Sequence, residues 1–137
     1  MKRNGGRGSC RPGKIEGQHD RKIINIASIA GLRGAVREFQ ATGHHASKGW
    51  VITLRKDLAC RWAVHNVHVN AIAPAWFSTN MSGMVIEGNQ EALRKRIPPG
   101  RFGNGRDLKA AAIFLVSAAS DFLTGHVLVV DGGQSAC

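Results

Sequence analysis

A histidine and a lysine at helical spacing are the first residues of this sequence that could do acid–base chemistry. His44 stands four residues before Lys48, so in a helix both side chains would lie on one face. An imidazole can donate or accept a proton near neutral pH. A neighbouring ammonium group lowers the pKa of an imidazole below about 6.5, which leaves less imidazolium to donate a proton. The pair is therefore a candidate proton-transfer site with an unfavourably low histidine pKa.

Two further polar residues follow apolar, β-branched runs. Ser28 follows residues 22–27, and Thr79 follows residues 67–72 after the break at Pro74. Runs of this kind, ended by Gly or Pro, are typical of buried strands that lead into loops. We therefore expect Ser28 and Thr79 to lie beyond the ends of two strands.

The elements that must position these residues alternate between strand and helix. Strands are predicted at residues 22–27, 67–72 and 126–130, and a loop at residues 31–45. A helix of about five turns is predicted from Ala46. Its apolar face comprises Val51, Leu54, Leu58 and Trp62.

A second long helix is predicted from Asp107 to Ala119, with Leu108, Ala111, Ala112 and Leu115 on one face. Residues 75–104 are predicted to be irregular, with a short apolar helix near residues 81–85. The alternation implies parallel strands joined by right-handed crossovers, with at least one sheet edge unguarded. The predicted fold class is α/β, and residues 22–137 form its domain.

Four segments of the chain, in order, resemble the short-chain dehydrogenase/reductase family. Residues 24–31, INIASIAG, resemble its strand-and-serine motif, and residues 44–49, HHASKG, resemble its Tyr-x-x-x-Lys segment. Residues 70–79, NAIAPAWFST, resemble its V-N-x-I-x-P-G-x-x-x-T segment, and residues 120–133 resemble its C-terminal signature. The resemblance implies the last three strands of a Rossmann-type sheet. Within the family, bacterial β-ketoacyl reductases and gluconate dehydrogenases look most similar.

The resemblance implies hydride transfer between a nicotinamide ring and a carbonyl carbon, while an acid delivers a proton to the carbonyl oxygen. Ser28 falls at the position that donates a hydrogen bond to that oxygen. His44 falls at the position of the proton-donating tyrosine. Lys48 falls at the position whose ammonium lowers the pKa of the acid and binds the nicotinamide ribose.

The remaining family positions imply contacts with NAD or NADP. Pro74, Phe77 and Thr79 fall where the family holds the nicotinamide, Phe77 through its backbone and Thr79 at the carboxamide. The implied substrate is a small ketone or alcohol.

Three departures weaken the implied activity. The 137 residues include no tyrosine, and we interpret His44 as a degenerated position rather than a working acid. Ala75 stands where the family has glycine, and no segment resembles the T-G-x-x-x-G-x-G loop that holds the cofactor pyrophosphate. We therefore expect a truncated or degenerate oxidoreductase that is weak or inactive alone and binds its cofactor weakly.

Two other functions stay open. In the family, the helix that carries the lysine packs against its copy in a partner subunit. Residues 51–62 could therefore form a non-catalytic interaction module, associating with a second copy or with an intact relative. Residues 1–22 carry a surplus of five positive charges and could bind nucleic-acid phosphates, but this segment has no aromatic residue for stacking on bases. We expect Trp50, Trp62 and Trp76 to be packing residues rather than a stacking platform for bases.

The composition adds further expectations. Residues 1–21 form a basic, glycine-rich arm that we expect to be flexible. The sequence contains no run of about 18 apolar residues, so we expect no membrane-spanning helix. No secretory signal is evident, so the cytoplasm is the default location. Cys10, Cys60 and Cys137 are scattered, which favours free thiols. No ligand set at metal-binding spacing accompanies the histidines, so we expect no metal site.

Overall fold

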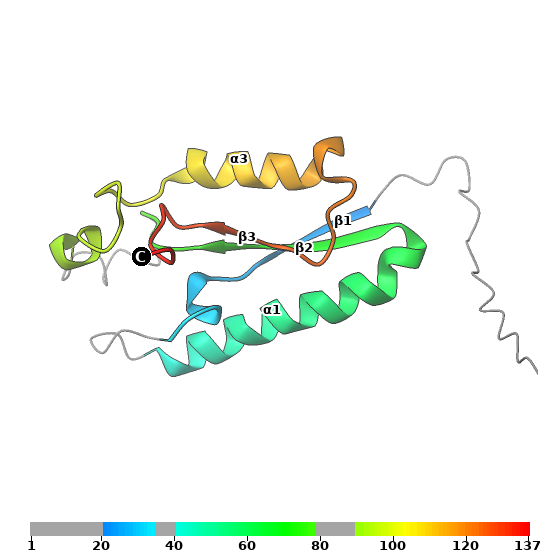
Figure 1. Ribbon diagram of the computed structural model, residues 1–137, viewed down its shortest axis with the longest axis horizontal. Helices are drawn as coiled ribbons and strands as arrows, with labels where there is room; N and C mark the ends of the chain where they lie inside the picture. Colours follow the sequence, from blue (N-terminus) through cyan, green and yellow to red (C-terminus); the bar gives the residue numbers. More distant parts are fainter. Residues whose placement is uncertain (1–20, 35–40, 79–89) are drawn as a thin grey trace, which may run out of the picture.

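A parallel sheet of three strands lies at the centre of the fold (Figure 1). The structure is a computed structural model, and it describes residues 21–34, 41–78 and 90–137. The strands, in the order in which they lie side by side, are β1 (Arg21–Ile26), β2 (Val67–Pro74) and β3 (Val127–Val130). The predicted α/β class and all three predicted strands are confirmed.

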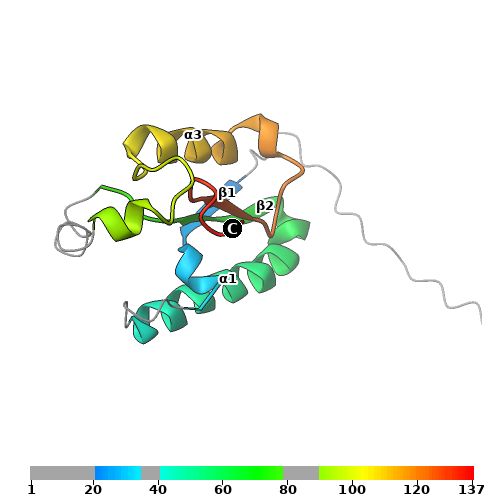
Figure 2. The same cartoon turned by 60° about the vertical axis from the view of Figure 1, so that its left-hand side comes forward.

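Two long helices cover the sheet on opposite faces (Figures 1 and 2). They are α1 (Thr42–Trp62) and α3 (Gly105–Val116). The connections contain the short 3-10 helices η1 (Ile29–Gly31), η2 (Ala63–His65) and η3 (Ala118–Ser120). The helix predicted near residues 81–85 and the predicted arm up to residue 20 lie outside the described residues. Within the described ranges, no helix is long and apolar enough to cross a membrane.

The two crossover connections have opposite hands. The chain passes from β1 through α1 to β2, and then through α3 to β3, so the strand order advances in one direction. Two right-handed crossovers in that order would place both helices on one face, whereas α1 and α3 lie on opposite faces (Figure 1). The expectation of right-handed crossovers is therefore wrong for one of them. The connection from β2 to α3 spans residues 75–104, which is long enough to carry the chain to the other face.

Helix α1 begins earlier than its sequence pattern predicts. It starts at Thr42 rather than Ala46, and the His45 N–H donates to the Ala41 carbonyl at 3.0 Å. The side chains of this first turn are mostly exposed. It therefore carries no apolar periodicity from which a helix could be predicted.

The side of α1 that faces the sheet also differs from the prediction. Its buried residues are Ile52, Arg55 and Ala59, whereas Leu54 and Leu58 of the predicted stripe are half-buried. Arg55 occupies a core position because its guanidinium donates to two backbone carbonyls. The predicted apolar face therefore lies partly open to solvent.

The face predicted for α3 is confirmed, although the helix begins at Gly105 rather than Asp107 and ends at Val116 rather than Ala119. Leu115, which lies on this face, is completely buried. Asn104 starts the helix with a capping box, in which its side chain accepts from the Asp107 N–H and the Asp107 carboxylate accepts from the Asn104 N–H.

The central strand β2 supplies the rigid core. Ala71 and Ala73 are completely buried and pack with Ala27 and Ile52 on the face covered by α1. The carboxyl ends of the three strands meet at one edge of the sheet, which is where open parallel sheets bind their ligands. Ser28 is positioned at this edge because it follows β1.

Candidate active site

Ser28 lies beyond the carboxyl end of β1 and caps the helix η1. Its hydroxyl oxygen accepts from the Ala30 N–H at 3.1 Å, and the hydroxyl donates to the Pro74 carbonyl oxygen over 3.5 Å. A separation of 3.5 Å is long for an O–H···O hydrogen bond. The hydroxyl hydrogen is therefore weakly held, and the half-buried side chain can turn it towards another acceptor.

Lys48 reaches the same end of β1 from helix α1. Its ammonium donates to the Ile26 carbonyl oxygen at 2.9 Å, and Ile26 precedes Ser28 by two residues. An ammonium has three donors. No carboxylate pairs with Lys48 within the described part of the chain, so its positive charge is available to a ligand or to a neighbouring acid.

Gly31 allows the Ser28 loop to lie directly against α1. A Cβ at this position would be 2.6 Å from the Lys48 carbonyl carbon and 2.8 Å from the Gly49 nitrogen. Real Cβ atoms do not approach backbone so closely. The absence of a side chain at Gly31 therefore sets how closely the loop of Ser28 approaches the helix of Lys48.

His44 lies in the exposed first turn of α1, within residues 31–45 that the sequence pattern predicts to be a loop. Its ring makes an edge-on contact with His45 at 6.4 Å between ring centroids. Partial burial lowers the pKa of His44 below 6.5, and the charges of Lys48 and His45 lower it further. The predicted effect of Lys48 on this pKa is confirmed in direction, although burial is the larger cause. The lowered pKa leaves less imidazolium at neutral pH, so the ring is a poor proton donor.

The segment after β2 is held by the loop that precedes α3. Phe77 forms a parallel bridge with Gly103, in which the Gly103 N–H donates to the Trp76 carbonyl at 2.9 Å and the Ser78 N–H donates to the Gly103 carbonyl at 3.2 Å. A Cβ at Gly103 would lie 2.6 Å from the Phe77 ring. Thr79 lies outside the described residues, so the structure does not place its predicted contact.

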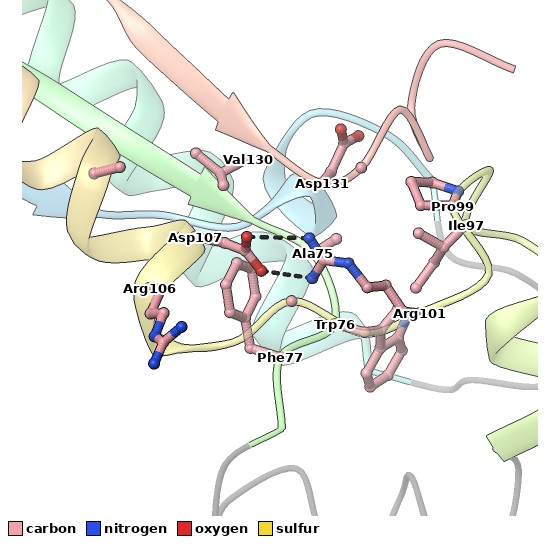
Figure 3. Close-up of a pocket in the computed structure, with 13 residues that line it drawn as sticks. Ala75, Trp76, Phe77, Ile97, Pro99, Arg101, Arg106, Asp107, Val130 and Asp131 are labelled. Carbon is pink, nitrogen blue, oxygen red and sulfur yellow. Dashed lines mark hydrogen bonds and ion pairs between the residues drawn. The ribbon is translucent and has the colours of Figure 1, made fainter.

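A cavity of 420 Å³ opens beside this segment, between α3 and the ends of β2 and β3 (Figure 3). Its walls combine the aromatic rings of Trp76 and Phe77 with apolar and charged side chains. Ala75 links the cavity to Pro74, but neither Ser28 nor Lys48 lines it. The cavity therefore lies next to the Ser28–Lys48 pair and not at it.

Arg101 and Asp107 form a bidentate ion pair at the cavity, with N···O distances of 2.7 and 3.1 Å (Figure 3). The hydrogen bonds from Arg101, and then the Asn104 N–H, hold the pKa of Asp107 at about 2. The carboxylate is already occupied by these donors. This pair therefore anchors the loop that contains Gly103 and is not poised to transfer a proton.

The described thiols and histidines form no metal-binding group. Across residues 21–34, 41–78 and 90–137, no three His, Cys, Asp or Glu side chains gather as a metal-binding group. Cys60 and Cys137 are exposed free thiols, and Cys10 lies outside these ranges.

Arg33 is a residue near the site that sequence reasoning missed. It donates from Nη1 to the Gln134 carbonyl at 3.1 Å, across 101 positions of sequence. No local pattern predicts a contact at that separation. Nearby, Trp76 lines the cavity, whereas Trp50 is 64% exposed and packs little within this chain.

Comparison with known proteins matches most of the chain to a family model and to several relatives. Residues 10–135 match a family model described as enoyl-(acyl carrier protein) reductase. The chain is 40% identical over 121 residues to the 2-dehydro-3-deoxy-D-gluconate 5-dehydrogenase of Dickeya dadantii, covering 87% of this chain and 47% of that protein. It is 40% identical over 111 residues to the 3-oxoacyl-[acyl-carrier-protein] reductase of Bos taurus, covering 81% of this chain and 44% of that protein.

The fold is likewise similar to solved structures. The crystal structure of a gluconate 5-dehydrogenase from Burkholderia cenocepacia, in complex with NADP and tartrate, matches with a TM-score of 0.77 and 39% identity. The match covers 85% of this chain and 45% of that one. The chain thus spans less than half the length of the relatives it matches.

Proposed function

Because this chain belongs to the short-chain dehydrogenase/reductase family, we propose that it is a truncated or degenerate NAD(P)-dependent oxidoreductase of small ketones and alcohols, with weak or no activity alone. The observation that carries the proposal is the convergence of Ser28 and Lys48 at the carboxyl end of β1. Two of the relatives are a gluconate-type dehydrogenase and a 3-oxoacyl reductase, which supports a carbonyl or alcohol as the substrate.

Ser28 and Lys48 have complementary roles in this proposal. The weakly held Ser28 hydroxyl donates a hydrogen bond to the carbonyl oxygen of the substrate and stabilises the negative charge that develops there. The Lys48 ammonium, held by the Ile26 carbonyl, binds ribose hydroxyls and favours the deprotonated form of a neighbouring acid.

The residues present fit the nicotinamide end of a cofactor, which would supply or accept the hydride. The bridge to Gly103 uses the Trp76 carbonyl and the Ser78 N–H, so the backbone groups of Phe77 face away from Gly103. This orientation supports a backbone contact from Phe77, with Pro74 and Thr79 completing the set. NADP in the Burkholderia cenocepacia structure supports the cofactor class.

His44 is poorly suited to the role of the proton donor. Its lowered pKa leaves little imidazolium at neutral pH, and an imidazole is shorter than the phenol that the family uses. We therefore assign low activity to this position rather than to Ser28 or Lys48.

The proposal is tested in a chimera that joins the amino-terminal half of the Dickeya dadantii enzyme to residues 22–137 of this chain. General acid catalysis contributes about 10² to 10⁴ in rate, so the His44→Tyr chimera should reduce a keto-gluconate faster than the His44 chimera by that factor. In the His44→Tyr chimera, Lys48→Met or Ser28→Ala should abolish the gain.

The opposite result is also informative. If the His44 chimera matches the tyrosine chimera, with a rate that falls as the pH rises through the histidine pKa, then His44 is a working acid. If neither chimera has activity although both bind cofactor, the oxidoreductase proposal fails.

A second candidate function is a non-catalytic interaction module. The observation that favours it is the exposed apolar surface of α1, where Trp50 is 64% exposed and Leu54 and Leu58 are half-buried. A second copy of this chain or an intact relative would cover this surface, as the resemblance implies. Exposed apolar surface of this kind marks an interaction site.

A further inference from the structure

The loop that carries Ser28 is tied to the carboxyl-terminal turn by Arg33. This half-buried residue follows η1 by two positions, and its guanidinium donates to the Gln134 carbonyl at 3.1 Å. We propose that Arg33 is a positioning residue, which holds the Ser28 hydroxyl in place by anchoring η1 to this turn. The role of Arg33 in catalysis rests on the proposed function, whereas its anchoring of η1 does not.

The turn that receives Arg33 is well ordered by its own hydrogen bonds. The Asp131 carboxylate accepts from the Gly133 N–H at 2.9 Å and from the Ser135 N–H at 2.7 Å. Gly132 and Gly133 have φ values of +61° and +82°, a conformation that favours glycine. Gln134 is 3% exposed, so its carbonyl is presented from a buried position.

Arg33 and the carboxyl-terminal turn that it contacts carry opposite charges. Burial alone would raise the pKa of Asp131, but hydrogen bonds from Ser135 and Gly133 and the charge of Arg33 bring it below 3.8. Asp131 is therefore ionised at neutral pH and attracts the guanidinium to the turn. A bond from a charged donor is stronger than one between neutral groups.

Arg33 transmits this anchoring directly to η1. Its backbone N–H donates to the Ile29 carbonyl at 3.2 Å, and the Leu32 N–H donates to the same carbonyl at 3.0 Å. The Ala30 N–H in turn donates to the Ser28 hydroxyl oxygen. Two hydrogen bonds, one to the Ile29 carbonyl and one from the Ala30 N–H, therefore connect Arg33 to the Ser28 hydroxyl. A displacement of Arg33 would shift this hydroxyl.

The loop has a second attachment, to helix α1. Gly31 packs against the α1 backbone at Lys48, on the face of the sheet covered by α1. That contact restrains the loop against the helix. Arg33 adds a restraint on the side of the carboxyl-terminal turn, which follows β3. Together the two attachments fix the loop against both the helix and the carboxyl-terminal turn.

Hydrogen exchange in the full ¹⁵N-labelled chain tests the anchoring. Arg33→Gln removes a charge-assisted hydrogen bond, so it should speed the exchange of the Ala30 and Leu32 amides by about tenfold or more. The amide of Ala71, in the core of β2, should be unaffected. Arg33→Lys should restore slow exchange, because an ammonium can also reach the Gln134 carbonyl.

A matched control removes a positive charge elsewhere. Arg61 is exposed and pairs with Asp57 on α1, so Arg61→Gln should leave the loop amides unchanged. Asp131→Asn should reproduce the effect of Arg33→Gln, and the double variant should add little. If Arg33→Gln does not fold, Asp131→Asn alone decides, since it disturbs the turn without altering the loop.

Two outcomes would overturn the proposal. The proposal fails if exchange at Ala30 in Arg33→Gln stays as slow as in the parent chain. It also fails if the Ala71 amide accelerates equally, because that would indicate a general loss of stability. In the active chimera, Arg33→Gln should lower kcat about tenfold with little change in KM, because a displaced hydroxyl weakens transition-state stabilisation more than binding. A loop effect in the isolated chain with no activity in any chimera would refute the proposed function and leave the anchoring intact.

Discussion

The Lys48 ammonium donates a 2.9 Å hydrogen bond to the carbonyl oxygen of Ile26, the last residue of β1. The neighbouring Ala27 N–H donates to the Ile72 carbonyl, so the backbone groups of Ile26 face the other edge of β1. Within the described residues, no strand pairs along that edge. Lys48 therefore satisfies an edge carbonyl and at the same time brings its charge within two residues of Ser28.

The pKa of His44 should respond to Lys48. We expect His44 to titrate below 6.5 in an NMR titration of its C2 proton, and Lys48→Gln to raise its pKa only partly, because burial is the larger cause. Lys56→Gln, at an exposed position of the same helix, is the control. An unchanged His44 pKa in Lys48→Gln would contradict the electrostatic coupling.

The same shift has a consequence for stability. Since the folded-state pKa of His44 lies below the unfolded value of 6.5, the unfolded state binds more protons in this window. The free energy of unfolding should therefore fall as the pH drops through 6.5. His44→Gln should reduce this pH dependence in urea denaturation, and an identical dependence in the variant would count against the assignment.

Gly31→Ala should destabilise the chain. The new Cβ would meet the α1 backbone at Lys48 and Gly49, which cannot move without shifting the helix. Overpacking of this kind costs about 1 to 3 kcal/mol, measurable by urea denaturation. Gly34→Ala is the matched control from the same loop, because no atom lies within 4 Å of its added Cβ. Equal stability of the two variants would show that the contact is not tight.

Arg101→Gln should raise the pKa of Asp107 from about 2 towards 3.8, although the Asn104 N–H will still hold it below that value. Because the folded-state pKa is depressed, the ionised carboxylate stabilises the fold above 3.8, and this contribution is lost as the pH falls through about 2. The variant should therefore begin acid unfolding at higher pH. A ¹³C titration of the carboxyl carbon measures the shift, and Arg106→Gln should leave it unaltered.

The 137-residue chain should bind NADPH weakly. Lys48 and the Phe77 segment can contact only the nicotinamide end, and no segment resembles a glycine-rich pyrophosphate loop. Calorimetric titration should show no saturation at micromolar concentration. A Kd of about 1 μM, equivalent to about −8 kcal/mol, would refute the view that the pyrophosphate loop dominates affinity.

Association through α1 can be tested at Trp50, which is 64% exposed. We expect the chain to form oligomers in light scattering at micromolar concentration, and Trp50→Gln to reduce their mass, because it removes apolar area from the surface that would be covered. Phe122→Gln, at a fully exposed aromatic residue in the connection to β3, is the control. A monomeric parent chain would exclude this interaction surface.

Local sequence patterns were sufficient to predict the α/β fold, the three strands and the apolar face of α3. Strand runs and helical periodicity reflect burial within one element, so they can be read from a short window. The positions of Ser28, His44 and Lys48 followed from the family resemblance, and the structure places Ser28 and Lys48 at the same end of β1.

Contacts between distant elements could not be predicted in this way. The core position of Arg55 and the tether from Arg33 to Gln134 depend on carbonyls far away in the sequence, at Gly125 and Gln134. The hand of each crossover depends on which face of the sheet the connecting helix covers. No local residue pattern determines that face. These features arise only when the strands pair and the helices pack, because backbone carbonyls accept donors from any side chain that the fold brings within reach.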